Sequence, residues 1–238
     1  MFNFSDRVAL VTGATGNLGG AVARAFYQAG ASLVLVDRST ERLAAAYPAE
    51  QFSPLRVHFA SADLTDEASV TALVAGAFDR FGRIDILANT VGGYRAGTPV
   101  HETSLETWEF MLTLNARTAF LISKAVVPAM LAQGGGKIVH VAARGGVSGS
   151  ARHGAYAASK SAVIRLVETL AAELRHDGIN VNCVLPGTID TPQNRAAMPG
   201  ADYSKWVTPE AIAEVMLFLA SEAARAVNGA AIPVYGRS

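Results

Sequence analysis

The sequence predicts an α/β fold: a doubly wound, seven-stranded parallel sheet with helices on both faces, in a single domain over residues 1–238. Short apolar runs alternate with longer amphipathic stretches along the whole chain, which is typical of parallel strands joined by crossover helices. With 238 residues, 50% of them hydrophobic, the chain is long enough to bury one large core. In such a fold ligands bind at the carboxyl ends of the strands, so we expect functional residues just after each strand.

Seven apolar runs have the length and composition of buried strands. They are Arg7–Thr12, Ser32–Asp37, Leu55–Ala60, Ile84–Asn89, Lys137–Ala142, Ile179–Leu185 and Ala230–Tyr235. The stretches between them that have helical periodicity are 17–30, 39–47, 66–81, 104–132, 154–177 and 208–222. Ser104 is placed to cap the fourth of these helices, and Gly30 and Gly178 follow the last turns of two others.

Composition excludes several classes of partner. Twenty basic and twenty acidic residues cancel, so we expect no general attraction to nucleic acid or to an anionic membrane. The amino terminus lacks a signal-peptide pattern, and no window holds about 18 uninterrupted apolar residues, the length of a membrane span. We therefore expect a cytoplasmic protein with a small-molecule substrate and no metal site. The single cysteine, Cys183, lies in an apolar run, where a buried thiol explains it better than a nucleophile does.

A glycine loop follows the first predicted strand and leads into a helix. Gly13 permits a tight turn, Gly16 lets the backbone approach a pyrophosphate, and Gly19 allows the helix to pack closely on the strand. The N–H groups at the start of the helix would face the anion. The residues between these glycines that complete the predicted cofactor loop include Thr15, Asn17 and Leu18. This order of strand, loop and helix predicts a Rossmann-type dinucleotide site.

The second predicted strand ends at Asp37, eighteen residues beyond Gly19. A carboxylate there can accept hydrogen bonds from the adenosine ribose and repels a 2′-phosphate, so NAD(H) is favoured over NADP(H). Arg38 weakens this preference, because its guanidinium could hold the phosphate. NADP(H) therefore stays open as an alternative cofactor.

Tyr156 and Lys160 are four residues apart in a predicted helix and therefore share one face. A cation within roughly 4–6 Å favours the phenolate, so we expect the lysine to lower the pKa of the tyrosine, which is ~10 for the free side chain. Such a pair suits a proton donor in catalysis. The spacing alone is common in helices, so this interpretation depends on the rest of the chain.

Further motifs follow in a fixed order. Asp63-Leu64 comes after the third predicted strand, Asn89 ends the fourth, Asn115 lies within a helix, and 186–192 reads Pro-Gly-Thr-Ile-Asp-Thr-Pro. With the glycine loop and the Tyr156/Lys160 pair, these motifs make the chain resemble the short-chain dehydrogenase/reductase family over essentially its whole length. The resemblance implies an NAD(P)-dependent oxidoreductase in which Tyr156 donates the proton and Lys160 holds the nicotinamide ribose.

The resemblance also assigns roles to the other motif residues. It implies that Asp63 and Leu64 flank the adenine, that Asn89 and Val91 line the cofactor cleft, and that Pro186, Gly187, Ile189 and Thr191 meet the carboxamide, Ile189 through its backbone and Thr191 through its hydroxyl. It implies that Asn115 bends its helix around a water that connects Lys160 to solvent. It further implies a homodimer or homotetramer formed through the helices at 104–132 and 154–177. These helices carry apolar residues beyond one stripe, a pattern consistent with burial against both the sheet and a partner: Phe120, Leu121, Val126, Val127, Val163, Leu166 and Leu170.

The chain departs from the family pattern at three places. Asn17 stands where the middle glycine of the loop belongs, and 89–92 reads Asn-Thr-Val-Gly instead of Asn-Asn-Ala-Gly. The family serine, expected thirteen residues before Tyr156, is Ala143. A methyl group cannot hydrogen-bond a substrate oxygen, and removing one preorganised donor from a developing oxyanion costs on the order of 10²–10³ in rate. Ser148 or Ser150 could replace it only along a different loop path.

One branch of the family, the dihydropteridine reductases, tolerates the loss of the serine. The chain resembles that branch at Gly92–Gly97 and in 190–207, which we predict to be a short substrate loop. A flat substrate would stack on Tyr94 or Trp206, and Ala143 and Arg144 would lie at the same pocket. Reduction of a quinonoid dihydropterin is therefore the most specific prediction. Two alternatives stay open: an oxidoreductase for an unidentified carbonyl, alcohol or quinone, and a redox sensor that binds NAD(H) without turnover.

Overall fold

The computed structural model describes residues 2–237, in which one parallel sheet has the strand order β3-β2-β1-β4-β5-β6-β7. The strands are β1 (Val8–Thr12), β2 (Ser32–Asp37), β3 (Val57–Ser61), β4 (Ile86–Asn89), β5 (Gly136–Val141), β6 (Ile179–Pro186) and β7 (Ala231–Val234). Each lies within two residues of its predicted run, so the predicted fold is confirmed. The strand order reverses between β1 and β4, and ligands of doubly wound sheets bind at such a point.

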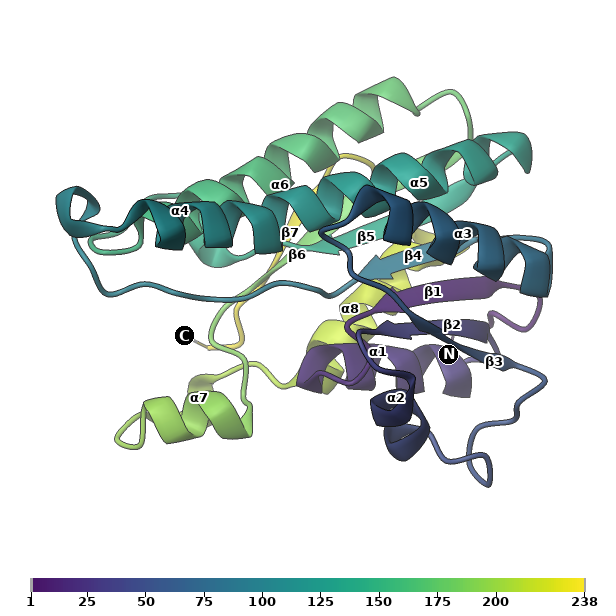
Figure 1. Cartoon of the computed structure of the whole chain (residues 1–238), viewed down its shortest axis with the longest axis horizontal. Helices are drawn as coiled ribbons and strands as arrows, with labels where there is room; N and C mark the ends of the chain where they lie inside the picture. The colour runs from purple at the N-terminus through teal and green to yellow at the C-terminus, as the bar shows by residue number, and fades with distance from the viewer. Residues whose placement is uncertain (1, 238) are drawn as a thin grey trace.

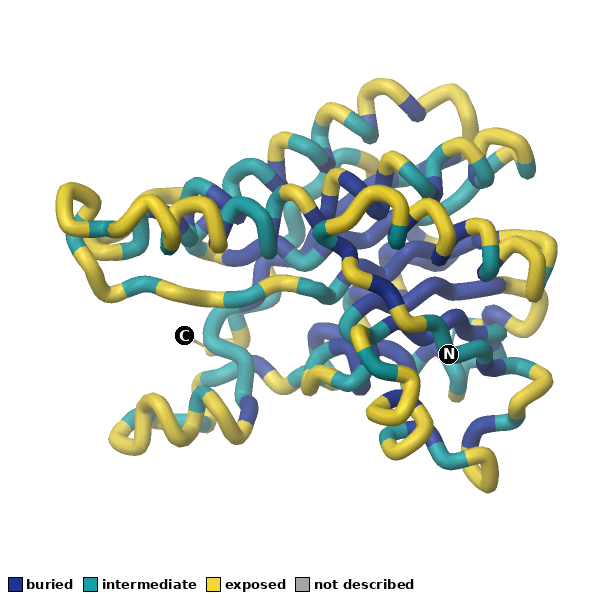
Figure 2. The backbone as a smooth tube through the Cα atoms, in the orientation of Figure 1, coloured by how far each residue is buried: buried dark blue, intermediate teal, exposed yellow. Residues whose placement is uncertain are grey.

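Helices cover both faces of the sheet (Figure 1). One face carries α1 (Asn17–Gln28), α2 (Thr40–Ala46) and α8 (Pro209–Ala220). The other carries α3 (Glu67–Phe81), α4 (Leu105–Met111), α5 (Thr118–Ala132) and α6 (Gly154–Glu173). Figure 2 shows the buried backbone concentrated in the strands and in the turns of the helices that face them. This burial on both faces explains why the strands read as continuous apolar runs.

β1 shows how the two cores are built. All five of its residues are buried. Val8 and Leu10 belong to the core under α3, α5 and α6, whereas Ala9 and Val11 belong to the core under α1 and α8. Successive side chains of a strand point to opposite faces, so the strand contributes to both cores and is fixed in the middle of the sheet.

The helix predicted at 104–132 is interrupted by a π-helical segment, Leu112–Arg117, between α4 and α5. Ser104 caps α4, as predicted, by accepting a hydrogen bond from the backbone N–H of Thr107 at 3.2 Å. Asn115 lies in the π-helical segment and is buried. Widened turns of this kind occur frequently at functional sites, where they re-aim a side chain.

The whole stretch Leu105–Ala132 is long and apolar enough, by length and composition alone, to cross a membrane, and 44% of its tested window is buried. Met111, Ile122, Val126 and Met130 of this stretch are buried in the described part of the chain. We therefore interpret it as a core helix that packs on the sheet.

The segment 190–207 contains a short helix, α7 (Pro192–Ala197), and a 3₁₀ turn, Tyr203–Lys205, which the sequence interpretation did not include. Thr191 caps α7 by accepting the backbone N–H of Asn194 at 3.2 Å. At the base of the segment, the N–H of Asp190 donates to the carbonyl of Val207 at 2.8 Å. The chain therefore leaves and returns at one point, beyond the carboxyl end of β6 (Figure 1).

Candidate active site at the carboxyl edge of the sheet

The glycine loop has the geometry of an anion cradle. Gly13 has a φ of +65°, a conformation that favours glycine. A Cβ added to Gly19 would lie 2.1 Å from the carbonyl oxygen of Gly13, so only glycine fits there. α1 starts after Gly16 with no side-chain cap and no acidic residue in its first turn. Its first N–H groups therefore have no intrahelical partner, and the loop fits the pyrophosphate of a dinucleotide.

The end of β2 lies against this glycine loop. The carboxylate of Asp37 accepts a short hydrogen bond from the hydroxyl of Thr15 and another from the N–H of Arg38 at 2.8 Å. Arg42, which the sequence interpretation missed, lies 3.4 Å from Asp37 and donates to Thr15 at 2.8 Å. Ser39 caps α2, and the first turn of this helix therefore places Arg42 over the end of β2. Ser39 is a recognisable capping residue in the sequence, so it could have identified Arg42 as a residue of this site.

Asp63 and Leu64 follow β3 at the same edge. The carboxylate of Asp63 is exposed and accepts hydrogen bonds from the N–H of Thr65 at 2.8 Å and from its hydroxyl at 2.7 Å. These bonds hold the pKa of Asp63 below its usual value. Leu64 is 6% exposed and packs in the core. The roles toward adenine that the resemblance implies for both residues remain predictions.

Asn89 lies at the end of β4, but its side chain points into the sheet. Its Oδ1 accepts from the hydroxyl of Thr12 at 2.6 Å, and its Nδ2 lies 3.0 Å from Nδ1 of His140. The other ring nitrogen of His140 lies 2.9 Å from the hydroxyl of Ser123. Burial, with Lys160 as a second cause, lowers the pKa of His140 to about 4, so the ring is neutral. The Asn89 amide therefore links β1, β4 and β5, and its place in the lining of the cofactor cleft remains a prediction.

Two neighbours of Asn89 contact the glycine loop. The hydroxyl of Thr90 donates to the carbonyl of Thr12 at 2.6 Å. A Cβ at Gly13 would lie 3.2 Å from the side chain of Val91 and equally far from the Thr90 hydroxyl. The end of β4 and the cofactor loop are therefore in van der Waals contact, as the prediction for Val91 requires.

Lys160 is 5% exposed, and its ammonium donates to the carbonyl of Val141 at 2.8 Å. Burial lowers the pKa of Lys160 to about 8. Burial also raises the pKa of Tyr156 to about 12, with Tyr94 as a second cause. This differs from the prediction that the lysine lowers the pKa of the tyrosine. The physical reason is that desolvation of the phenol dominates, while the ammonium is bound to a backbone carbonyl.

Asn115 connects the π-helical segment to the chain that follows β4. Its Oδ1 accepts from the N–H of Gly93 at 2.9 Å, and its Nδ2 donates to the carbonyl of Gly93 at 3.1 Å and to the hydroxyl of Ser159 at 2.9 Å. A Cβ at Gly92 would lie 2.8 Å from Asn115 Oδ1 and 3.0 Å from Lys160 Nζ. Glycine at 92 therefore allows the two polar side chains to approach each other. The water predicted beside Asn115 remains a prediction.

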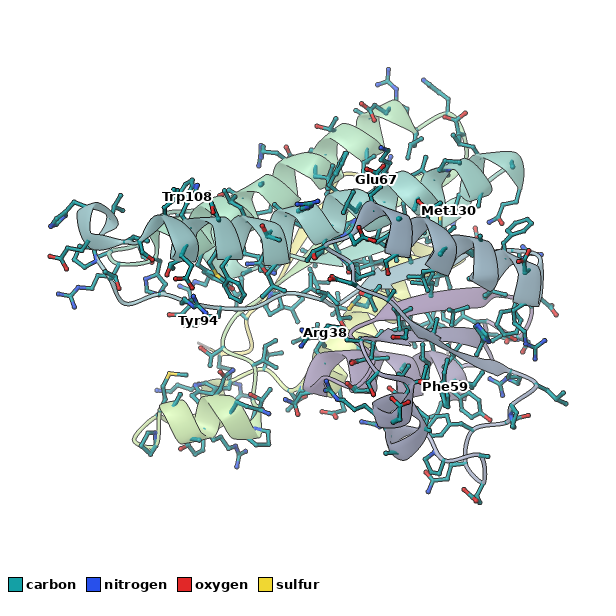
Figure 3. The ribbon with its side chains drawn as sticks, viewed as in Figure 1. Arg38, Phe59, Glu67, Tyr94, Trp108 and Met130 are labelled. Carbon is teal, nitrogen blue, oxygen red and sulfur yellow. The ribbon has the colours of Figure 1, made fainter. Side chains whose placement is uncertain are left out.

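Tyr94, Tyr156 and His153 come together at this edge. The rings of Tyr94 and Tyr156 pack edge to face with centroids 4.8 Å apart. The hydroxyl of Tyr94 lies 2.9 Å from Nε2 of His153. Figure 3 shows Tyr94 on the extended segment that runs from β4 to α4. Nothing in the sequence links His153 to Tyr94, which lies 59 residues away, and the sequence interpretation missed His153.

Ala143 follows β5 and is 6% exposed. Ser148 and Ser150 are exposed on the loop that follows. The guanidinium of Arg144 stacks 5.1 Å from the ring centre of Tyr235, near the carboxyl terminus. The replacement of the family serine by Ser148 or Ser150 therefore remains a prediction.

The segment 190–207 is ordered by its own side chains. Arg195 forms a two-point ion pair with Asp190, at 2.6 and 2.7 Å, and stacks on Tyr203. The rings of Tyr203 and Trp206 lie 4.8 Å apart. Trp206 therefore packs within this segment, and Tyr94 is the predicted stacking residue that lies beside Tyr156.

The remaining predicted cofactor residues lie around the start of this segment. Pro186 ends β6, and the N–H of Gly187 donates to Val234 at 3.2 Å. Ile189 pairs with Val207, and Thr191 accepts the cap hydrogen bond of α7. Their contacts with a carboxamide stay predictions. Asn17, which stands in place of a family glycine, donates to Gln193 at 2.8 Å and so joins the cofactor loop to α7.

Residues 7–201 match the family described as short chain dehydrogenase. D-threitol dehydrogenase of Mycolicibacterium smegmatis is 36% identical, over 99% of this chain and 94% of that protein. NAD-dependent glycerol dehydrogenase of Listeria innocua is 34% identical, over 96% of this chain and 92% of that protein. The structure of a gluconate 5-dehydrogenase from Burkholderia cenocepacia, in complex with NADP and tartrate, superimposes with a TM-score of 0.91 at 30% identity, over 99% of this chain and 96% of that one.

Proposed function

The chain belongs to the short chain dehydrogenase family of NAD(P)-dependent oxidoreductases, and from this premise we propose that it interconverts an alcohol and a carbonyl compound with NAD(H) as the preferred cofactor. The observation that carries the proposal is the placement of Tyr156 and Lys160 at the same edge of the sheet as the glycine loop. The relatives named above support the substrate class, since their names specify polyol and hydroxy-acid dehydrogenases.

A bound nicotinamide would supply or accept the hydride. The residues of the chain would bind the cofactor and the substrate and transfer the proton. Tyr156 exchanges a proton with the substrate oxygen, Lys160 would hold the nicotinamide ribose, and Asn115 fixes the backbone of Gly93 beside them. The raised pKa of Tyr156 keeps the phenol protonated at neutral pH, which suits a proton donor in the direction of reduction.

The preference for NAD(H) rests on the position of Asp37. Its carboxylate faces the glycine loop and repels a 2′-phosphate. Arg42 opposes this preference, because its guanidinium lies 3.4 Å from the carboxylate and provides donors for a phosphate. Arg38, next to Asp37 in the sequence, carries a second guanidinium that could do the same. We therefore propose a moderate preference for NAD(H), with measurable activity on NADP(H).

Ala143 favours a second candidate, reduction of a quinonoid dihydropterin. Such a substrate is already electron-poor, so it needs no serine hydroxyl to polarise a carbonyl. The exposed ring of Tyr94 beside Tyr156 offers a surface on which a flat substrate can stack. None of the relatives named above carries a pterin in its name, so we place this candidate second.

The test is a panel of steady-state assays on the purified chain. NAD⁺ and NADP⁺ are tried with polyols and hydroxy acids, and NADH and NADPH with ketones, quinones and quinonoid dihydropterin. The proposal expects turnover with an alcohol–carbonyl pair and a higher kcat/KM with NAD(H). Turnover with the dihydropterin alone would support the second candidate. Micromolar NADH binding without turnover of any substrate would contradict both and indicate the redox sensor.

We also propose that the chain forms a homodimer or homotetramer through α4 and α5. Of the apolar residues that the sequence interpretation placed outside a single stripe, Leu121, Val126 and Val163 are buried in the core, whereas Phe120 is exposed. Large apolar side chains that are exposed on α4 and α5 are Leu105, Trp108, Phe110, Phe120 and Leu131. A surface of this kind indicates a protein interface.

Light scattering after size-exclusion chromatography tests whether the chain forms this oligomer. A monomer at micromolar concentration would contradict the proposal.

A further inference from the structure

We infer that Tyr94 and His153 form a hydroxyl–imidazole pair that hydrogen-bonds the substrate oxygen in place of the missing serine hydroxyl. Tyr94 would contact the substrate, and His153 would act through Tyr94 as a positioning residue. The inference rests on the proposed function, because it names the group that recognises the alcohol or the carbonyl at the same site. Its starting point is Ala143, whose methyl group leaves Tyr156 without the usual second hydroxyl.

Backbone contacts hold the pair in place. Two hydrogen bonds with the Asn115 side chain, one accepted and one donated by it, fix Gly93, the residue before Tyr94. A third, from the N–H of Gly97 to the carbonyl of Arg152 at 2.9 Å, joins the Tyr94 segment to the loop that carries His153. Arg152 has a φ of +64°, a strained conformation for a residue with a side chain. Both segments are therefore held where Tyr94 packs on Tyr156.

The second nitrogen of His153 determines the direction of the hydrogen bond. Nδ1 lies 2.7 Å from the carbonyl oxygen of Ala151, and a carbonyl can only accept, so Nδ1 carries a proton. In the neutral imidazole, Nε2 is then an acceptor, and the hydroxyl of Tyr94 donates to it at 2.9 Å. The hydroxyl proton of Tyr94 is therefore used in the hydrogen bond to His153 and is not free for donation to a substrate. The oxygen of Tyr94 can therefore accept a hydrogen bond from a substrate hydroxyl.

Protonation of His153 reverses this hydrogen bond. Both ring nitrogens of an imidazolium donate, so Nε2 donates to the oxygen of Tyr94 and releases the Tyr94 proton for donation to a substrate carbonyl. The neutral pair therefore favours the alcohol, and the charged pair favours the carbonyl.

Charged and titratable groups surround the pair on each element that packs against it. They are Arg152 on the His153 loop, Tyr156 on α6, Arg95 on the Tyr94 segment with Glu106 of α4 at 4.0 Å, and His101 with Glu102 at 3.4 Å on the 3₁₀ turn Val100–Glu102.

The first test compares pH profiles of kcat/KM in both directions. The wild type should lose ketone reduction and gain alcohol oxidation through one ionisation. Tyr94→Phe should lower kcat/KM for reduction at pH 6 by roughly tenfold to a hundredfold, consistent with the loss of one donor at the reacting oxygen. His153→Asn should abolish that ionisation and lower kcat/KM for reduction by less than Tyr94→Phe does, because the Tyr94 hydroxyl remains, and the double variant should match Tyr94→Phe. His101→Asn is the matched control and should leave both profiles unchanged. Wild-type profiles in Tyr94→Phe and His153→Asn would overturn the inference.

The second test needs no turnover and so separates this inference from the proposed function. Long-range proton–nitrogen NMR spectra of the histidine side chains report which ring nitrogen carries the proton in the free chain and in its NAD⁺ complex. We expect neutral His153 with its proton on Nδ1, and a shifted Nε2 resonance in Tyr94→Phe. A proton on Nε2, or an Nε2 resonance that Tyr94→Phe leaves unchanged, would overturn the inference even if the enzyme is active.

Discussion

The cofactor side and the substrate side of the site are built in different ways. The cofactor side is formed mainly by backbone: the φ of Gly13, the contact that only a glycine at 19 allows, and the uncapped start of α1. The substrate side is formed by side chains from segments that are far apart in the sequence. Tyr94, His153 and Tyr156 come from the β4–α4 segment, a surface loop and α6.

The difference shows which changes each side tolerates. A backbone cradle needs glycine at fixed places, and its ligand is set by a common pyrophosphate. A side-chain pocket can lose a hydroxyl, as at Ala143, and acquire another group beside the same tyrosine. We therefore expect variants on the substrate side to change kcat and the choice of substrate, and variants on the cofactor side to change dinucleotide affinity.

The largest expected effect is that of Tyr156→Phe. Removing the proton donor should lower kcat by about 10²–10⁴, the contribution of a positioned general acid. NADH affinity, measured by fluorescence titration, should stay within about threefold of the wild type if the two sides are separable. Tyr27→Phe, at the far end of α1, is the matched control and should be fully active. A large loss of NADH affinity in Tyr156→Phe would contradict the separation.

A smaller effect is expected from Asp37→Ala. Loss of the carboxylate removes the repulsion of a 2′-phosphate and leaves Arg42 and Arg38 as donors, so the ratio of kcat/KM for NADPH to that for NADH should rise about tenfold, equivalent to ~1.4 kcal/mol. In Asp37→Ala/Arg42→Ala the gain for NADPH should be smaller than in Asp37→Ala, because Arg38 is then the one donor of this pair that remains. An unchanged cofactor ratio in the single variant would show that this corner does not select the cofactor.

The smallest effect concerns stability and pH. His140 is buried, and its pKa is lowered from 6.5 to about 4. Between these values the unfolded chain binds a proton that the folded chain does not, so stability should fall as the pH drops from 6.5 to 4 and should be unaffected by this group above 6.5. His140→Asn should be less stable at pH 7, because it loses hydrogen bonds, but should show a flatter decline in acid.

Urea denaturation at pH 7 and pH 4.5 measures the effect of His140→Asn. His176→Asn, at an exposed site, is the control and should follow the wild type. An identical acid decline in His140→Asn and the wild type would show that the buried network around Asn89 does not carry this pH dependence.

Much of the fold could be predicted because parallel strands buried on both faces leave a strong apolar pattern, and all seven were found within two residues. α7 was missed because six residues, with one proline, three polar side chains and two alanines, carry no periodic pattern. The π-helical segment was missed because its widened turn depends on the contacts of Asn115 with Gly93. Both features depend on tertiary contacts that a local pattern does not record.

The candidate site divides in the same way. Gly13, Gly19 and Asp37 could be recognised, because each follows a strand at a fixed spacing. His140 could have been found, since a polar residue within a buried strand must have a partner. The pairing of Tyr94 with His153 could not, because it joins two loops whose approach is set by the packing of α6 and the β4–α4 segment.

The central claim is that Ala143 leaves position 143 without a hydroxyl donor that ketone reduction would use. Ketone reduction by Ala143→Ser, measured with NADH, tests it most directly. The added hydroxyl should raise kcat/KM by roughly tenfold to a hundredfold and leave reduction of the dihydropterin unchanged. A folded Ala143→Ser variant that binds NADH normally and reduces ketones no faster than the wild type would contradict the account.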